Sequence, residues 1–255
     1  MGFNTVDYMQ DGCGAGPSRG IWADFGAEPD LYVSVEDDFL TFEDQASTVQ
    51  HGGYITYMDT NVTCVQQKTE QSGVIMLDTI DADNEEGAIT LHDSNILGAF
   101  VTTAGSNKKV WFETRVKFSD ITAQSGYVGL ATANSPADSL IPDAGTGVTG
   151  LNCIGFSVLE ASPATLQAIY DTAAGVTTLE AAAGTLVADT WVKLGFRYNG
   201  TNIEYYVDGV TVATVLATAD NVPDGAYLAP LWALKSHEAD DKNLSVDWWK
   251  FGIER

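Results

Sequence analysis

Strict alternation of apolar and polar side chains restricts the fold of this chain more than any other feature of its sequence. In residues 110–118, apolar side chains alternate with Glu113, Arg115 and Lys117. A period of two residues sends successive side chains to opposite faces of a strand, whereas an amphipathic helix needs a period of about 3.6 residues. The segment is therefore predicted to be a β-strand with one buried face and one wet face.

Residues 191–198, 203–207 and 210–216 repeat this alternation in three consecutive segments. Asn199-Gly200 separates the first two segments, and Asp208-Gly209 separates the last two. Both pairs supply the positive φ angles that two-residue hairpin turns require. We predict an antiparallel meander of three strands.

Further segments have the composition of strands, and helical patterns are nearly absent. These strand candidates are residues 54–58, 62–66, 74–77, 88–92, 127–131, 153–159, 166–170, 176–180, 227–234 and 244–253. The run from Ala181 to Ala183 is too short for a helix, and Gly184 ends it. Many short strands separated by Gly, Asn and Asp turns indicate an all-β chain that folds as an antiparallel β-sandwich or jelly roll.

The first fifty residues differ from the rest of the chain. Residues 11–20 contain glycines and a proline that interrupt any ladder or helix, yet aromatic residues follow them directly. This predicts an extended arm lying on another surface, either its own sandwich or a neighbouring subunit, with a frayed terminus as the alternative. We divide the chain into an arm with a first edge segment, 1–50, and a sandwich, 51–255. The arm residues expected to contact a partner are Phe3, Tyr8, Ile21, Trp22 and Phe25.

The charge of the chain excludes several classes of partner. Asp and Glu number 35 against 12 Lys and Arg, so the net charge is −23. Nucleic acids and anionic membranes both need clustered cations on the protein, and neither is expected as a partner. No apolar run has the length of a membrane span, and the first twenty residues lack the basic and apolar regions of a signal peptide.

The cysteines give no sign of a metal site. Cys13, Cys64 and Cys153 are far apart, and no CxxC pair occurs. We expect three reduced, partly buried thiols, with a disulfide between two of them as the alternative.

Carboxylates that could carry glycoside hydrolysis do not form a pattern. That reaction needs two carboxylates flanking the scissile bond. Glu160 and Asp247 are the nearest candidates, and each stands alone in the sequence. No nucleophile elbow, HExxH pair or P-loop occurs either. The sequence therefore predicts that the chain is not an enzyme.

One acidic loop leaves a metal site open. Residues 77–87 begin like a calcium loop, but the glycine comes one place late, and His92 stands where a bidentate Glu is required. Two interpretations remain, a looser calcium site or a solvated acidic loop. The carboxylates of the first interpretation are Asp78, Asp81, Asp83 and Glu85. We expect no other cofactor.

The Trp248-Trp249 pair raises the question of sugar binding. Neighbouring residues of a strand point to opposite faces, so one indole is expected in the core and the other on the outside. An outward Trp could serve as a platform for a glycan, as a subunit contact or as a cover for its own loop. The pair is therefore our candidate for glycan binding.

Motifs in the second half of the chain carry a resemblance to a known family. They are VWFETRVKF at 110–118, YVGLA at 127–131, IGFSVLE at 154–160, LVADTWVKLGFRYNG at 186–200, YVDG at 206–209 and LSVDWW at 244–249. Residues 108–255 resemble virion structural proteins of tailed bacteriophages that carry a concanavalin A-like lectin/glucanase jelly roll. The opening MGFNTVDYMQDG, followed by GAGPS at 14–18, is similar to the start of such phage proteins.

The resemblance implies a fold and a setting rather than a catalytic residue. Glucanases of this superfamily carry paired acids on one strand, and legume-type lectins carry an acidic metal loop; neither pattern is present here. The resemblance implies a decoration or cement protein on the capsid exterior, a homo-oligomer on the particle whose partners are the major capsid protein and neighbouring copies of itself. A lectin-like, glycan-binding module of a tail or fibre is the alternative, followed by a glycoside hydrolase or lyase. A strong negative charge suits the outside of a shell, because it keeps a protein away from packaged DNA.

Overall fold

The computed structural model describes most of the chain. The described residues are 17–26, 31–40, 42–45, 49–51, 53–67, 73–91, 99–100, 108–132, 140–172 and 177–255. Phe3 and Tyr8, two of the predicted contact residues, lie outside them, as do Cys13 and His92.

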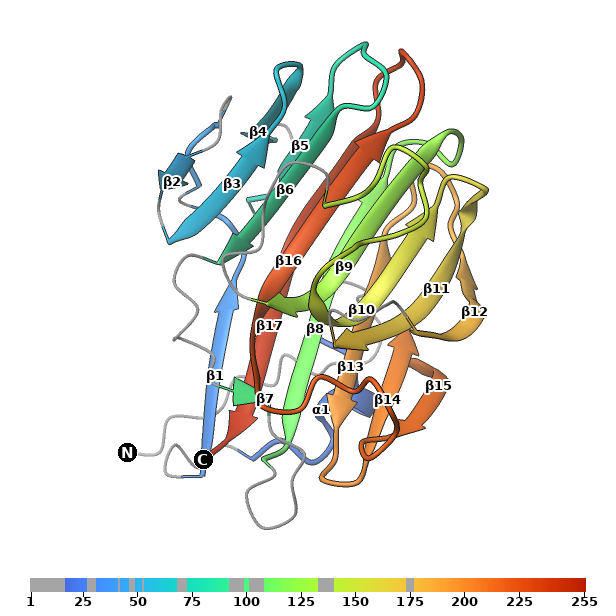
Figure 1. Cartoon of the computed structure of the whole chain (residues 1–255). Coiled ribbons are helices and arrows are strands. Elements are labelled where there is room, and N and C mark those ends of the chain that lie inside the picture. Colours follow the sequence, from blue (N-terminus) through green and yellow to red (C-terminus); the bar gives the residue numbers. More distant parts are fainter. Residues whose placement is uncertain are drawn as a thin grey trace.

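The described strands form two antiparallel sheets that face each other as a sandwich (Figure 1). Sheet A has eight strands, in the order β15 (Val210–Leu216), β14 (Asn202–Val207), β13 (Val192–Tyr198), β8 (Val110–Phe118), β17 (Asn243–Glu254), β5 (Ile75–Thr79) and β4 (Val62–Gln66), with β1 (Tyr32–Asp37) also paired to β17. Sheet B has nine strands, in the order β12 (Thr177–Thr185), β11 (Ser162–Thr172), β10 (Asn152–Leu159), β9 (Gln124–Thr132), β16 (Ala226–Ser236), β6 (Glu86–Leu91), β3 (Tyr54–Met58) and β2 (Val49–His51), with β7 (Ala99–Phe100) also paired to β16. The predicted all-β sandwich of concanavalin A-like type is confirmed.

The core lies between the two sheets and is rich in aromatic side chains. Phe112 and Phe196 of sheet A pack with their ring centroids 5.8 Å apart, and Trp249 lies 6.2 Å from Trp232 of sheet B. All four side chains are buried. Large aromatic side chains remove much apolar area from water, so this layer supplies most of the driving force for folding.

The meander forms as β13, β14 and β15, in antiparallel register. Gly200 has a φ of 95° at the first turn, and Asp208 and Gly209 have φ of 49° and 78° at the second. Positive φ at both central residues makes the second a type I′ turn, whose twist matches that of the flanking strands. The second turn is thus as predicted, whereas at the first turn Gly200 has a positive φ and Asn199 does not.

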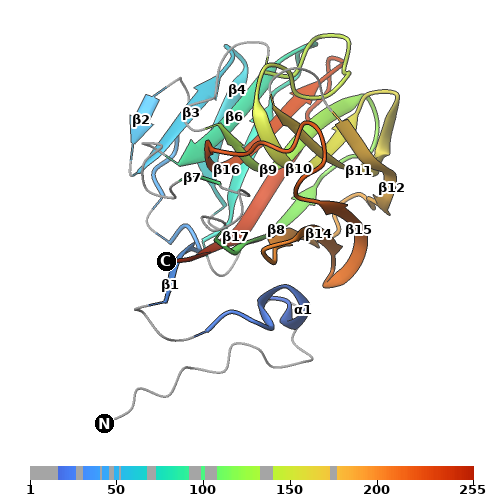
Figure 2. The ribbon, with the colours of Figure 1, turned by 60° about the horizontal axis from the view of Figure 1, so that its bottom comes forward.

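The described part of the arm lies on the outer face of sheet A in the same chain (Figure 2). It contains the single-turn helix α1 (Arg19–Trp22), so the expectation that residues 11–20 form no regular element is wrong for Arg19 and Gly20. The turn is held from outside: the buried carboxylate of Glu113 accepts hydrogen bonds from the backbone N–H of Ser18 at 2.8 Å and from the indole N–H of Trp22 at 2.9 Å. Tertiary bonds of this kind order a helix too short to be stable by itself.

Apolar side chains in the described part of the arm make this contact with the sandwich. Ile21 and Trp22 are buried with Trp111, and the ring of Phe25 packs edge-on against Trp111 at 5.0 Å. Ile21, Trp22 and Phe25 therefore contact their own sandwich, the first of the two surfaces expected for the arm. No helix in the described part of the chain has the length and hydropathy needed to cross a membrane.

Residues 140–151 cover the outer face of sheet B (Figure 1). This segment, which we call the covering segment, precedes β10 and buries four aliphatic side chains, Leu140, Ile141, Val148 and Leu151. They pack on outward residues of five strands, which include Ala88, Tyr127, Cys153, Ile169 and Leu231. The outer face of sheet B is therefore a second, smaller core.

Candidate functional site

An aromatic and cationic strip runs across the outer face of sheet A, beside the docked arm. Strand register places Arg115 of β8 between Lys193 of β13 and Trp248 of β17. The next position along β8 on this face is Lys117, and Trp191 immediately precedes β13. All five side chains are half-buried. We call them the Trp191–Trp248 strip.

Trp191 holds two cations of the strip in place. The guanidinium carbon of Arg115 lies 4.5 Å from the centroid of the Trp191 ring, and the ammonium of Lys117 lies 5.0 Å from it. A cation over an indole face is attracted by the quadrupole of the ring. Arg115 also donates a hydrogen bond at 2.5 Å to Asp247, which sits at the β-bulge of β17. A rigid patch of indole and fixed charge results.

The two adjacent tryptophans separate as expected, one on each side of β17. Trp249 is buried in the core, where its indole N–H donates to the hydroxyl of Tyr54 at 2.9 Å. Trp248 lies half-buried on the outer face beside Arg115. Trp249 is therefore not available to a ligand, and Trp248 is the member of the pair that fits a glycan platform.

The acidic loop of residues 77–87 does not converge on one point. Glu85 accepts hydrogen bonds from the backbone and side chain of Asn61, and the N–H of Asp81 donates to Asp241 at 2.9 Å. Burial, followed by the charge of Asp241, raises the pKa of Asp78. Among the described residues, the group of three carboxylates that lie close enough to share a metal ion contains none of the loop's acids.

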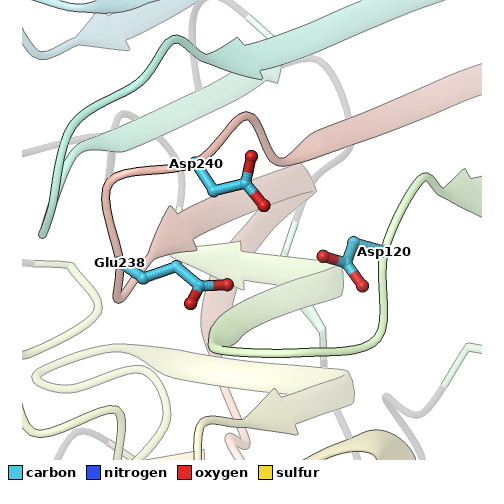
Figure 3. A group of neighbouring side chains, drawn as sticks. All are labelled: Asp120, Glu238 and Asp240. Atoms are coloured by element: carbon cyan, nitrogen blue, oxygen red, sulfur yellow. The ribbon is translucent and has the colours of Figure 1, made fainter.

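That group is Asp120, Glu238 and Asp240, whose carboxylates point toward one another (Figure 3). A lysine of the same chain, Lys242, lies within hydrogen-bond or ion-pair distance of all three. The ammonium of Lys242 lies 2.5 Å from Asp120, 2.7 Å from Glu238 and 3.4 Å from Asp240. Burial acts to lower the pKa of Lys242, but hydrogen bonds to Asp120 and Glu238 outweigh it and raise the pKa. A fixed ammonium supplies the positive charge that a cation would otherwise bring.

A second ionic cluster pins the covering segment to sheet B. The ammonium of Lys235 donates to the carbonyl of Ile141 at 2.9 Å and to Asp143 at 2.6 Å, and it lies 3.7 Å from Glu86. Glu86 is fully buried and accepts the backbone N–H of Ile141 at 3.1 Å. Burial raises the pKa of Glu86 to about 7, although the bond from Ile141 and the charge of Lys235 act in the opposite direction. Both residues bind backbone atoms of Ile141, so their principal contact is with the covering segment.

His237 lies close to the same segment. Its Nε2 is 2.9 Å from the hydroxyl of Ser125, and its Nδ1 is 3.9 Å from Glu160. Burial lowers the pKa of His237, so the ring is neutral at pH 7. Gly145, with a φ of 57°, lies over Ser125 and Glu160, and a Cβ at that position would meet both. Ser125 is fully buried, which closes this arrangement to a substrate in the described conformation.

The other carboxylates and thiols singled out in the sequence lie apart from one another or are buried. Asp247 pairs with Arg115, and Glu160 faces His237, so neither forms a pair of carboxylates with the other. Cys64 and Cys153 are free and buried thiols. Burial raises the pKa of Cys153 to about 12, which keeps it protonated and unreactive.

Comparison with known proteins gives the fold. No protein-family model matches the sequence, and no match was found among curated proteins. Among the solved structures that are similar to the chain, three illustrate the fold. An endo-β-1,4-glucuronan lyase from the fungus Trichoderma reesei is 12% identical, with a TM-score of 0.54 over 83% of this chain and 94% of that chain. Peanut lectin is 14% identical, with a TM-score of 0.56 over 87% and 97%. SCLam, a non-specific endo-β-1,3(4)-glucanase of family GH16, is 12% identical, with a TM-score of 0.55 over 89% and 93%.

These neighbours correct one prediction. The expectation that the chain is not an enzyme is contradicted, because a lyase and a glycoside hydrolase are among the structures most similar to it. The absence of paired acids in the sequence was too weak a ground for that expectation. A lectin is also among the neighbours. Identities this low carry the fold alone.

Proposed function

We propose that this chain binds glycans and that the Trp191–Trp248 strip is its binding surface. The observation that carries the proposal is the pair of half-buried indoles, Trp191 and Trp248, beside Arg115 on the outer face of sheet A. An indole offers an apolar face to the C–H surface of a sugar ring, and neighbouring polar groups fix the ring hydroxyls.

The opposite sheet supports this choice of surface. The outer face of sheet B is covered by Leu140, Ile141, Val148 and Leu151, so the residues beneath them have no contact with solvent. The peanut lectin, the glucuronan lyase and the glucanase named above show that proteins of this fold act on or bind carbohydrates. Both observations favour a carbohydrate ligand on the face that the covering segment leaves open.

A glycan array followed by calorimetry tests the proposal. Trp248→Ala is expected to lower affinity about tenfold, because loss of a stacking face costs roughly 1.5 kcal/mol. Trp191→Ala is expected to lower it as well, because Arg115 and Lys117 lose the ring over which they lie. Tyr227→Ala is the matched control, since Tyr227 is an aromatic residue that is 54% exposed on sheet B. Unchanged affinity in both Trp variants would exclude this surface. New reducing ends, measured in the same samples, would reveal turnover as well as binding.

The capsid role implied by the resemblance is supported less well. A decoration protein on a capsid exterior, with the major capsid protein and neighbouring copies as partners, was expected to use the aromatic residues of its arm. Ile21, Trp22 and Phe25 instead contact their own sandwich. Virion location therefore stays a prediction, which images of labelled protein on purified particles would test.

A further inference from the structure

We propose that Ser125, His237 and Glu160 form a serine hydrolase centre for carboxylic esters, and that residues 142–147 of the covering segment close it. We call these residues the lid turn. Ser125 lies near the start of β9, Glu160 follows β10 and His237 follows β16. Because β10 and β16 both run antiparallel to β9, these three positions meet at one end of sheet B, away from the Trp191–Trp248 strip on sheet A.

The three side chains make the contacts that nucleophilic catalysis by a serine requires. The hydroxyl of Ser125 lies 2.9 Å from Nε2 of His237, within reach of proton transfer. Burial lowers the pKa of His237, so the ring is a free base at pH 7. Glu160 lies 3.9 Å from Nδ1, which is buried and has no hydrogen-bond partner among the described residues. A carboxylate on that side favours the tautomer with the proton on Nδ1, which leaves Nε2 to accept the serine proton.

A carbonyl group of the lid turn occupies the place where the carbonyl of a substrate would react. The oxygen of Gly145 accepts the hydroxyl of Ser125 at 3.4 Å and the backbone N–H of Glu160 at 3.2 Å. A backbone N–H in this position would stabilise the oxyanion of a tetrahedral intermediate. The same contact directs the serine proton away from His237. The closed turn therefore fills the centre and keeps the nucleophile inactive.

The lid turn comes this close to the sheet because residue 145 is a glycine. A Cβ there would overlap the Cβ of Glu160 and lie 3.0 Å from the hydroxyl oxygen of Ser125. Beside it, Asp143 binds Lys235 at 2.6 Å, and the Asp143 side chain is 73% exposed. Ion pairs that water reaches contribute little to stability, so the turn can open locally while the two sheets stay folded.

The reaction balances with an ester and water as the reactants. The Oγ of Ser125 bonds to the ester carbonyl carbon while its proton passes to Nε2 of His237. The intermediate then expels the alcohol, which takes that proton as its bond to the carbonyl carbon breaks. Water attacks the acyl-serine in the same way, and the carboxylic acid leaves as His237 returns a proton to Oγ. Stabilisation by the N–H of Glu160 favours an ester over an amide, because an alcohol leaves more readily than an amine.

Labelling of the full chain with a fluorophosphonate probe, which reacts with activated serines, tests the proposal. Peptide mass spectrometry should place the label on Ser125, and Ser125→Ala should abolish both labelling and hydrolysis of 4-nitrophenyl acetate. Gly145→Ala should speed labelling about tenfold, because overlap of the added Cβ destabilises the closed turn. Gly150→Ala is the matched control, since Gly150 has a φ of 70° in the same segment and nothing within 4 Å of its Cβ position. Asp143→Ala loosens the same turn at an exposed residue, so the test does not depend on Gly145→Ala folding.

Glu160→Gln tests Glu160 as a positioning residue for His237. The charge of Glu160 raises the pKa of His237, as do those of Asp83 and Asp143, whereas Lys235 lowers it. Labelling needs the neutral ring, so Glu160→Gln in the Gly145→Ala background should move the pH midpoint of labelling to lower pH. A carboxylate with a purely structural role would leave this midpoint unchanged.

The outcomes decide the proposal without touching glycan binding at the strip. Label on Ser125 that Gly145→Ala and Asp143→Ala increase, and that Gly150→Ala does not, supports it. Absence of label on Ser125 in all of these proteins would overturn it, and so would equal labelling rates in Gly145→Ala and Gly150→Ala. Ester hydrolysis that persists in Ser125→Ala would show that another residue reacts.

Discussion

The two sheets have outer faces of opposite character, although both belong to one sandwich. On sheet A the arm docks through a buried carboxylate and aromatic contacts, and the Trp191–Trp248 strip lies half-buried beside it. On sheet B the covering segment docks through aliphatic side chains and through the ionic cluster of Lys235, Asp143 and Glu86, which we call the ionic pin. The difference teaches that the segments lying on a sheet, rather than the sheet itself, decide which face can meet a ligand.

The largest loss of stability is expected from a substitution at the covered outer face of sheet B. Ile141 of the covering segment is fully buried against sheet B, so Ile141→Ala should lower the free energy of unfolding by about 2–5 kcal/mol through lost burial and a cavity. Urea denaturation measures the change. Val187→Ala, at a residue 60% exposed, is the control and should be nearly neutral. A small effect at Ile141 would mean that the segment is a loose cover, and the contrast between the faces would fail.

The ionic pin is expected to give the sheet B face a pH dependence. The pKa of Glu86 is about 7 in the folded protein, against an ordinary value of 4.5. The folded state therefore retains a proton between these two pH values that the unfolded chain has released, so the free energy of unfolding falls as pH rises through this window. The full shift corresponds to a loss on the order of 3 kcal/mol.

Glu86→Gln isolates this contribution, because an amide does not titrate and its oxygen can still accept the N–H of Ile141. Urea denaturation of both proteins between about pH 4 and 8 should show a smaller fall for the variant. His237, whose pKa burial lowers, contributes equally to both curves and cancels in the difference. Parallel curves would show that Glu86 has no raised pKa and that the pin is not sensitive to pH.

On the outer face of sheet A, the buried carboxylate of Glu113 should hold the arm against the sheet. Glu113→Ala leaves the N–H groups of Ser18 and Trp22 without an acceptor in a buried site, at a cost of about 2 kcal/mol. Trypsin should then cleave after Arg19 faster, because the arm opens more often. Glu113→Gln retains an acceptor and is the control. Unchanged cleavage would show that the aromatic contacts alone hold the arm.

The sequence predicted the strands of the two sheets better than it predicted the segments that lie on their outer faces. The period of two gave β3 and β4 at their observed bounds, and the turn residues gave the meander, because both signals are local. The strand expected at 74–77 is observed at Ile75–Thr79, since pairing with β17 extends it. The alternation also placed one of Trp248 and Trp249 outside.

The positions of the arm and of the covering segment depend on contacts between residues that are far apart in the sequence. Leu140, Ile141 and Val148 lie in a segment without apolar periodicity, so the local sequence does not predict that these side chains are buried against a sheet. The position of Arg115 beside Trp191 depends on the register of β8 with β13, and the docking of α1 depends on Glu113. The sequence places Arg115, Lys117 and Glu113 on the polar face of a strand, but it does not identify the residues that they contact.

Lys242 lies in the connection between β16 of sheet B and β17 of sheet A. It should contribute less to stability than the segments that cover the two outer faces do. Lys242→Met removes the ammonium from among Asp120, Glu238 and Asp240, so we expect a loss of about 1 kcal/mol from hydrogen bonds and carboxylate repulsion. Calcium at millimolar concentration should restore the melting temperature of the variant and leave that of the natural chain unchanged. Magnesium, which is smaller and holds its water more tightly, is the control. An equal response of both proteins to calcium would place the ion elsewhere.

The smallest effect on stability is expected at the strip itself, and it sharpens the contrast with Ile141. Trp248 is half-buried on an open face, so Trp248→Ala leaves no closed cavity and should cost about 1 kcal/mol or less in urea denaturation. The same variant should lose glycan affinity by a much larger factor, which separates a binding role from a structural one. A loss of stability as large as that of Ile141→Ala would show that Trp248 packs as a core residue. The two outer faces would then differ in composition but not in purpose.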